Sequence, residues 1–249
     1  GATVRFVGAV GRDADGDDVL AVLAAEGVDV DDVTRAEANT GTALICVDAA
    51  GENQIAVAPG ANRHASAHGV ALGGVAVVVA QLEAPLAAVA ELFERSRAAG
   101  ARTVLNAAPV HSGHEDAIRG ALGLVDVLVV NEGELDALHP GTGSVGARAA
   151  AIVDPEAGHA TPGAVLVSRG AAGVVWLPAD GPALEIPGHV VNAVDTVGAG
   201  DALCGALAAG LALGLGEQVA VIRANAAGAL AATRPGARSS PTSAEIDAL

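Results

Sequence analysis

A seven-residue string, DTVGAGD at 195–201, carries the clearest chemistry of the sequence, and the apolar stretch after it predicts a helix over 199–213. A Gly-Ala-Gly turn at a helix N-terminus lets backbone N–H groups converge at the positive end of the helix dipole, and that arrangement binds anions. Asp201, in the first helical turn, would lie beside the anion, where its carboxylate can take a proton from an attacking hydroxyl. The pattern indicates phosphoryl transfer, because positioning and charge neutralisation dominate its catalysis. Taken alone, the same residues also fit a tight turn followed by an acidic helix start.

Short apolar runs alternate with helical stretches along most of the chain. Most of the runs are apolar on both faces, which is typical of strands buried in a parallel sheet. They fall at 4–7, 75–80, 102–106, 125–130, 164–168 and 174–177. Helices are predicted at 17–26, 85–99, 116–122, 132–138 and 145–152, followed by two long Ala-rich helices at 199–213 and 217–233. The alternation predicts a doubly wound, mostly parallel α/β sheet sandwiched by helices, in a single domain over residues 1–249.

One segment breaks this rhythm. Residues 42–48 and 53–58 alternate in polarity around a turn at 49–52, which predicts an antiparallel hairpin within about residues 40–60. A hairpin inserted between α/β units projects from the main sheet, so it can act as a small β lid over a site at the strand ends, where open α/β sheets bind ligands. The alternative is an edge hairpin without ligand contact.

The composition excludes several classes of protein. Because 13 basic and 29 acidic side chains give a net charge of −16, the chain repels phosphate backbones and anionic lipid, and we expect neither nucleic-acid nor membrane partners. Cys46 and Cys204 lie far apart, form no CxxC motif and are expected to be small buried hydrophobes. Without a signal peptide or an apolar stretch of membrane-spanning length, the sequence predicts a cytoplasmic protein. The acidic run at 13–18 is interpreted as a solvated face.

The whole string at 195–201 resembles DTxGAGD, the C-terminal signature of the ribokinase family of sugar kinases, also called the phosphofructokinase-B family. The resemblance implies a ribokinase-like fold. It also implies that Asp201 is the catalytic base and that the amides of Gly198, Ala199 and Gly200 stabilise the transferring phosphoryl group.

Further motifs extend the resemblance over nearly all of the chain. Glu83, in QLEAP at 81–85, is similar to an acid that contacts the sugar in ribokinases, although an exposed cap would look the same. NEGE at 131–134 resembles the family's NxxE, which implies that Asn131 binds nucleotide and that Glu134 organises Mg²⁺ through water. The same spacing fits a helix N-cap with a capping-box acid, and the two readings are compatible. The other residues that the resemblance assigns to the nucleotide are Ser168, Gly170, Gly173 and Asn225, of which Asn225 could simply face solvent.

TRPGA at 233–237 looks like part of the loop that wraps a monovalent cation in ribokinases. The K⁺ ligands implied by the resemblance are Asp195, Val197, Ala231, Arg234, Gly236 and Ser240. Asp195 would also hold the sugar, and the hairpin residues Ala43 and Ile45 would close over it. Closure would exclude water and so suppress hydrolysis of ATP.

These motifs together imply an ATP-dependent kinase that phosphorylates the primary hydroxyl of D-ribose, with ATP, Mg²⁺ and K⁺ in its site and a homodimer formed through the lid. Ribokinases begin with an Asn-x-Asp strand and a GGKGAN segment, and neither string occurs here, so we expect the gene product to extend upstream of Gly1. Two alternatives stay open. One is an N-terminally truncated, inactive kinase-like fragment that binds nucleotide, and the other is a related kinase for another furanose sugar or a nucleoside.

Overall fold

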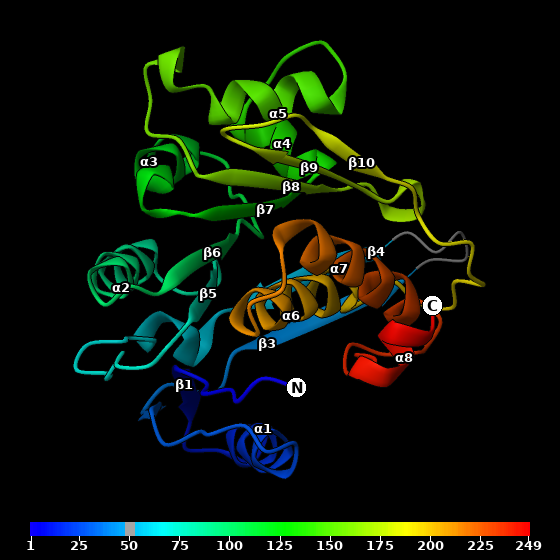
Figure 1. Ribbon diagram of the computed structural model, residues 1–249. Coiled ribbons are helices and arrows are strands. Elements are labelled where there is room, and N and C mark those ends of the chain that lie inside the picture. The colour runs from blue at the N-terminus through cyan, green and yellow to red at the C-terminus, as the bar shows by residue number, and fades with distance from the viewer. Residues whose placement is uncertain (48–52) are drawn as a thin grey trace. The chain divides into compact units, whose positions relative to one another are not determined.

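A computed structural model describes residues 1–47 and 53–249 of the chain (Figure 1). The chain divides into two compact units. The large unit comprises residues 1–2, 72–82 and 93–249, and the small unit comprises residues 3–71 and 83–92. Within the described part of the chain, no helix combines the length and the apolar character that crossing a membrane requires.

The large unit is built on a six-stranded sheet in the order β10-β9-β8-β7-β6-β5. Its strands are β5 (Val77–Gln81), β6 (Arg102–Asn106), β7 (Val127–Asn131), β8 (Ala164–Ser168), β9 (Val174–Pro178) and β10 (Leu184–Ile186). Strands β5 to β8 run parallel, whereas β9 and β10 each pair with their neighbour in antiparallel fashion. The polar ends of four parallel strands are therefore brought to one edge of this sheet.

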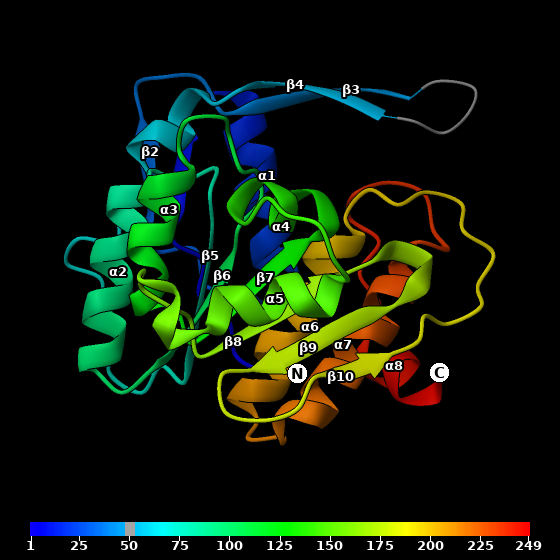
Figure 2. The ribbon, with the colours of Figure 1, turned by 90° about the horizontal axis from the view of Figure 1, so that it is seen from above.

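Helices cover both faces of the large sheet, as Figures 1 and 2 show. Helices α4 (Glu132–Leu138) and α5 (Val145–Val153) pack on one face over β7, β8 and β9, and α3 (Glu115–Ala121) packs beside α4. Helices α6 (Ala199–Ala212) and α7 (Glu217–Ala231) pack on the other face, and α8 (Ser243–Ala248) packs on α7. Three single 3₁₀ turns complete the unit: η2 (Leu122–Leu124), η3 (Pro155–Ala157) and η4 (Gly170–Ala172).

The core between the sheet and α6/α7 explains the abundance of small residues. Leu203, Leu207 and Leu211 of α6 are buried against inward-facing side chains of the sheet, among them Trp176. An alanine Cβ at Gly210 would lie only 2.9 Å from the Cβ of Ala220, so the two helices approach more closely than larger side chains would permit. This close contact joins the C-terminal half of α6 to the first turn of α7.

The small unit holds a parallel strand pair, a projecting hairpin and one long helix. Strands β1 (Gly8–Gly11) and β2 (Val33–Ala36) are joined through α1 (Ala14–Ala25), and the hairpin consists of β3 (Thr42–Val47) and β4 (Asn53–Ala58). The 3₁₀ helix η1 (Gly60–His64) buries Ala61 against Ala9 and Ala36. Helix α2 (Leu86–Ala98) belongs to this unit as far as Leu92 and to the large unit from Phe93 onward.

The α/β class, the mostly parallel sheet and the hairpin are confirmed, while the first predicted strand is wrong. Residues 4–7 form only an isolated bridge between Arg5 and Asp29, and the strand lies instead at Gly8–Gly11, all of whose residues are buried. Val4 and Phe6 are exposed, so the apolar side chains that suggested a strand do not face a core. Strands β2 and β10 and helix α8 were not predicted, and the predicted turn at 49–52 lies outside the described residues.

Candidate active site

The carboxyl ends of the four parallel strands carry polar side chains next to one another. Gln81 of β5 stands opposite Asn106 of β6, and Asn131 of β7 stands opposite Ser168 of β8. In open α/β sheets, ligands bind at this edge, outside the carboxyl ends of the strands. The sheet therefore places a row of hydrogen-bonding groups where a polar substrate can be held.

The NEGE segment forms a complete capping box at the start of α4. Asn131 accepts a hydrogen bond from the Glu134 backbone N–H at 2.8 Å, and the Glu134 carboxylate accepts one from the Asn131 N–H at 2.8 Å. This confirms the predicted N-cap. Burial raises the pKa of Glu134, and the hydrogen bond from the Asn131 backbone opposes that rise. The box uses one oxygen of each side chain, so the second carboxylate oxygen of Glu134 is the group that can face a hydrated metal ion.

The GAG turn places Gly198 in a conformation that few other residues adopt. Gly198 is the N-cap of α6 with a φ of 80°, and an added Cβ would lie 2.6 Å from the carbonyl oxygen of Ala237. Gly200 differs, because it has no positive φ and a Cβ built on it meets nothing within 4 Å among the described residues. The fold therefore requires glycine at 198, while open space lies in front of Gly200.

Not every amide of this turn faces outward. The first N–H groups of a helix lack intrahelical partners by position, but the Ala199 N–H donates to the carbonyl of Thr196 at 3.2 Å. The amides of Gly198 and Gly200 are therefore those to which an anion-binding role can apply, and the predicted contribution of Ala199 has a competing acceptor.

Two acidic side chains influence the Cys204 thiol, one turn into α6, through their charge. Burial, and after it the negative charges of Asp201 and Glu134, raises the pKa of the Cys204 thiol to about 12. The buried environment predicted for Cys204 is confirmed, and its thiol stays protonated at neutral pH. Burial also raises the pKa of Asp201, although one side of this residue remains open to solvent. Glu134 of α4 and Asp201 of α6 thus act on one region of the large unit.

Asp195 joins the segment before α6 to the loop after α7. Its carboxylate accepts hydrogen bonds from the backbone N–H of Val197 at 3.0 Å and of Gly236 at 2.8 Å. These two bonds hold the pKa of Asp195 below its ordinary value, and the bond from Val197 has the larger influence. The backbone N–H groups of Val194 and Asp195 also donate to the carbonyl of Ala232, at 2.8 and 3.2 Å. The two segments that were predicted to share a cation are therefore adjacent.

The charge of the predicted ligands suits a monovalent cation, and so does the backbone geometry of some of them. Among the described residues, Asp195 forms no ion pair with a basic side chain, so its negative charge is balanced by backbone N–H groups alone. The Ala231 carbonyl already accepts hydrogen bonds from the Arg234 N–H and the Ser239 hydroxyl, at 3.1 and 3.3 Å. The Arg234 side chain pairs with Glu245, which leaves only its carbonyl as a candidate ligand. Val197, Gly236 and Ser240 lie on the same two segments.

The residues assigned to a nucleotide lie at the end of β8 and on α7. Gly173 has a φ of 89°, and an added Cβ would lie 2.1 Å from the carbonyl oxygen of Ile186, so the turn from Gly170 to Gly173 packs directly on the chain after β10. Asn225 is only 6% exposed, and its amide donates to the carbonyl of Pro187 at 2.9 Å. The solvent-facing alternative for Asn225 is wrong. The hydrogen bond from Asn225 to Pro187, which the sequence did not indicate, joins α7 to the segment that leads to Asp195.

Of the residues assigned to the sugar, Glu83, Ala43 and Ile45 lie in the small unit, whereas Asp195 lies in the large unit. Glu83 is exposed and comes directly after Leu82, whose N–H donates to the Ala108 carbonyl at the carboxyl end of β6. Ala43 and Ile45 alternate along β3 and share one face of the hairpin with Val57, which pairs with Ala43. Their contact with the sugar stays a prediction.

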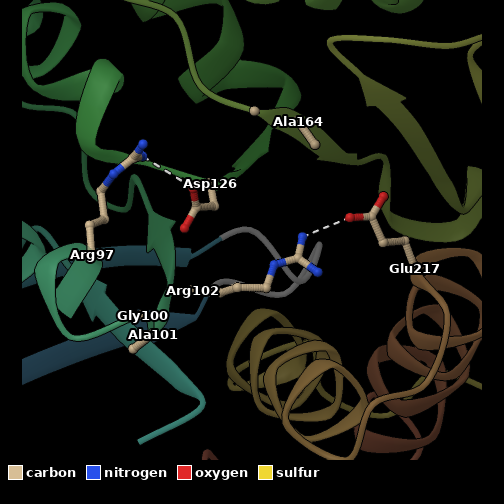
Figure 3. A pocket seen from close by; sticks show the side chains of 8 residues that line it. Arg97, Gly100, Ala101, Arg102, Asp126, Ala164 and Glu217 are labelled. Carbon is tan, nitrogen blue, oxygen red and sulfur yellow. Dashed lines mark hydrogen bonds and ion pairs between the residues drawn. The ribbon is translucent and has the colours of Figure 1, made fainter. Parts of the chain in front are cut away.

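A depression of about 410 Å³ lies at the opposite edge of the large sheet (Figure 3). It is lined at the amino ends of β6, β7 and β8 by two ion pairs, Arg97 with Asp126 at 3.1 Å and Arg102 with Glu217 at 2.7 Å. Both guanidinium groups are thus engaged by carboxylates. The depression shares no residue with the cluster around Asp201, and we do not assign the chemistry to it.

Comparison with known proteins matches residues 1–244 to the pfkB family of carbohydrate kinases. A ribokinase of Haemophilus influenzae is 32% identical over 98% of this chain and 80% of its own length. A bifunctional ribokinase/ribose-5-phosphate isomerase A of Fructilactobacillus sanfranciscensis is 33% identical over 96% of this chain, which spans 45% of that longer protein. A crystal structure of a ribokinase from Thermotoga maritima is similar with a TM-score of 0.85 at 29% identity, covering 98% of this chain and 80% of that one.

Proposed function

Because the chain belongs to the pfkB family of carbohydrate kinases, we propose that this sugar kinase transfers the γ-phosphoryl group of ATP to the primary hydroxyl of D-ribose. The observation that carries the proposal is the N-terminus of α6, where Asp201 follows a GAG turn whose Gly198 packs on the Ala237 loop. The ribokinases among its relatives support ribose as the sugar.

In the proposed reaction, Asp201 accepts the proton of the sugar hydroxyl as the hydroxyl oxygen attacks the γ-phosphorus. The amides of Gly198 and Gly200 donate to the phosphoryl oxygens on which negative charge accumulates. Burial around Asp201 raises its pKa, and a more basic carboxylate is the better proton acceptor provided that it is ionised at the working pH. The products are the sugar phosphate and ADP, and the bond between the γ-phosphorus and its bridging oxygen breaks.

Glu134 and Asn131 are the residues that we assign to the metal–nucleotide end of the site. Mg²⁺ keeps several waters and takes few protein ligands, so a carboxylate fixed by a capping box suits contact through water. When bound, the ion would neutralise charge on the phosphates. Glu134 would orient a water ligand of the ion, and its carboxylate is held in place by the hydrogen bond from the Asn131 N–H.

We assign the nucleotide to the surface formed by Ser168, the turn from Gly170 to Gly173, and Asn225. The row of strand ends puts Ser168 beside Asn131, so one ligand can contact both. Gly170 and Gly173 both have positive φ, which presents backbone rather than side chains to the ligand. The side-chain amide nitrogen of Asn225 donates a hydrogen bond to the Pro187 carbonyl, so the side-chain carbonyl oxygen is the group left to accept a hydrogen bond from a ligand.

On the sugar side, the proposal assigns hydrogen bonds to Glu83 and Asp195 and closure to Ala43 and Ile45. A two-stranded hairpin has no second sheet to pack on, and its exposed apolar side chains suit a cover that exchanges solvent for ligand. Closure over the sugar keeps water from the γ-phosphoryl group. The other face of the hairpin carries Leu44, which is 67% exposed, and we propose that a second copy of the chain covers it in a homodimer.

A monovalent cation, K⁺ in the proposal, would lie between Asp195 with Val197 and the segment from Ala231 to Ser240. The support is the carboxylate of Asp195, which joins these segments by accepting hydrogen bonds from the backbone N–H groups of Val197 and Gly236. A cation there would stiffen the loop against which Gly198 packs. The cation would therefore influence the GAG turn indirectly, by fixing the backbone position of that loop.

The test is a sugar panel with product identification. The purified chain is incubated with ATP, Mg²⁺ and K⁺, and with D-ribose, 2-deoxy-D-ribose, D-fructose, D-ribulose or adenosine, and products are identified by mass spectrometry and ³¹P NMR. We expect D-ribose to give ribose 5-phosphate with the highest kcat/KM. A preference for another furanose or a nucleoside would replace ribose as the substrate, and nucleotide binding without turnover on any acceptor would contradict the kinase activity of this chain.

A further inference from the structure

A partly buried network of hydrogen bonds lies at the base of the hairpin, within the small unit. The Asp13 carboxylate accepts from the Gly16 N–H at 2.9 Å, from the Thr40 hydroxyl at 2.5 Å and from the Thr40 N–H at 2.8 Å. The Thr40 hydroxyl in turn accepts from the Gly11 N–H at 2.9 Å. Strand β1, the start of α1 and the residue two positions before β3 are thereby joined through one carboxylate.

Glycines let these segments approach closely enough to form the hydrogen-bond network. An added Cβ at Gly16 would lie 2.6 Å from the Gly11 carbonyl oxygen, and one at Gly11 would lie 2.6 Å from the Thr40 nitrogen. On the far side of the hairpin, an added Cβ at Gly60 would lie 2.3 Å from the Asn39 carbonyl oxygen, which also accepts from the Ala61 N–H at 2.8 Å. The two ends of the hairpin are therefore joined to each other at Asn39, and the first end is also joined to β1 and α1.

Beyond these contacts, no other strand in the described part of the small unit pairs with the hairpin. Strands β3 and β4 pair only with each other, and Leu44, Ile45 and Val57 are exposed. A two-stranded ribbon without a covering layer is only marginally stable, so its direction depends on how its base is held. The orientation of Ala43 and Ile45 consequently depends on the backbone position of Thr40.

We infer that Asp13 and Thr40 are positioning residues that hold the hairpin in the orientation in which Ala43 and Ile45 close over the sugar. The inference deepens the proposed function and rests on it. The acidic run at 13–18, interpreted from the sequence as a solvated face, thus has a different role at its first residue.

All three partners of Asp13 are donors, so an uncharged amide at this position would direct its own N–H groups at one of them. The Thr40 hydroxyl also holds the pKa of Asp13 below its ordinary value, as do the N–H groups of Thr40 and Gly16.

A purely local role for Asp13 is the competing explanation, because it is also the N-cap of α1. The Thr40 hydroxyl separates the two roles. Asp13 caps α1 through the Gly16 N–H and needs no hydroxyl for that bond. Thr40→Val therefore leaves the cap in place and removes both bonds of the hydroxyl, the one it donates to Asp13 and the one it accepts from Gly11, while the Thr40 N–H still donates to Asp13.

The test compares Thr40→Val with Thr40→Ser, which keeps the hydroxyl, and with Ser144→Ala, which removes the side-chain cap of α5 in the large unit. For Thr40→Val we expect the KM for D-ribose to rise about tenfold, the KM for ATP to stay constant, and sugar-independent ATP hydrolysis to grow relative to turnover. Thr40→Ser is expected to restore the wild-type values, and Ser144→Ala is expected to change neither ratio. An unchanged KM for D-ribose in Thr40→Val, with the wild type active on ribose, overturns the inference.

Hydrogen–deuterium exchange separates this inference from the proposed function. In the absence of ligands, Thr40→Val is expected to exchange faster than the wild type at residues 42–47 and 53–58, with no change in α1. If the wild type does not phosphorylate D-ribose, the proposed function fails, and exchange at the hairpin still decides whether Thr40 holds it. Equal exchange in the two proteins overturns the positioning role whatever the substrate.

Discussion

The two glycines of the GAG turn give a contrast that separates folding from chemistry. Gly198→Ala forces a residue with a side chain into a left-handed conformation, which costs about 1–2 kcal/mol. The added Cβ would also lie 2.6 Å from the Ala237 carbonyl oxygen, which belongs to the backbone and cannot simply rotate away. Displacement of that loop brings the expected loss to about 2–4 kcal/mol in the free energy of unfolding.

Gly200→Ala is the matched variant, two positions further along the same helix. Gly200 has no positive φ, and its Cβ direction is open, so alanine is expected to gain up to about 1 kcal/mol of helix propensity. The new methyl group would protrude into the space in front of the α6 N-terminus, where the proposal places the phosphoryl group. Because small displacements of reacting groups are costly, we expect turnover to fall by about 10²-fold.

The assay is thermal unfolding of both variants followed by steady-state kinetics with ATP and D-ribose. For a chain of this size, Gly198→Ala should lower the Tm by about 5–15 °C, whereas Gly200→Ala should leave it equal or higher. A Gly198→Ala variant as stable as the wild type would contradict the packing of this turn on Ala237. A Gly200→Ala variant with wild-type turnover would contradict the assignment of the phosphoryl group to this helix start.

Three further predictions concern the cation, pH and assembly. Replacing K⁺ by Na⁺ should slow the wild type several-fold and leave Asp195→Asn, slow in both salts, indifferent to the exchange; equal wild-type rates would remove the cation site. Since burial raises the folded-state pKa of Asp201, the associated stability is present below the unfolded pKa and is lost as pH rises through the folded pKa. Asp201→Asn at neutral pH should therefore not lower the Tm. Wild-type turnover should fall as acidification protonates Asp201. A clear loss of stability in the variant would contradict this, because it would show that the wild-type protein compensates the charge of Asp201 well. Leu44→Ser should convert a dimer into a monomer by light scattering, and an unchanged mass would exclude Leu44 from the interface.

Features with strong local signals were predictable from the sequence. The α4 cap could be predicted because Asn131 and Glu134 have the spacing that lets side chain and backbone exchange hydrogen bonds over one turn. The start of α6 could be predicted because glycine, apolar periodicity and Asp201 coincide there. The hairpin followed from alternation, which depends on neighbouring residues alone.

Features that depend on distant partners were not predictable. Strand β1 is formed by Gly8–Gly11, which has weak strand propensity and is stabilised by burial and by pairing with β2. Asp13 looked like one acid in a charged run because its partner, Thr40, lies 27 residues away. Asn225 likewise could not be placed from the helical pattern, since its Pro187 partner is 38 residues distant.

The central claim is that Asp201 takes the proton of the attacking hydroxyl, and the most direct measurement is single-turnover phosphoryl transfer from labelled ATP to D-ribose in Asp201→Asn. General-base catalysis contributes about 10²–10⁴-fold, so the rate should fall by that factor. The Kd for ATP, measured by calorimetry, and the Tm should show that the variant still binds nucleotide and folds. A transfer rate close to that of the wild type, in a variant with intact ATP binding, would contradict the role of Asp201.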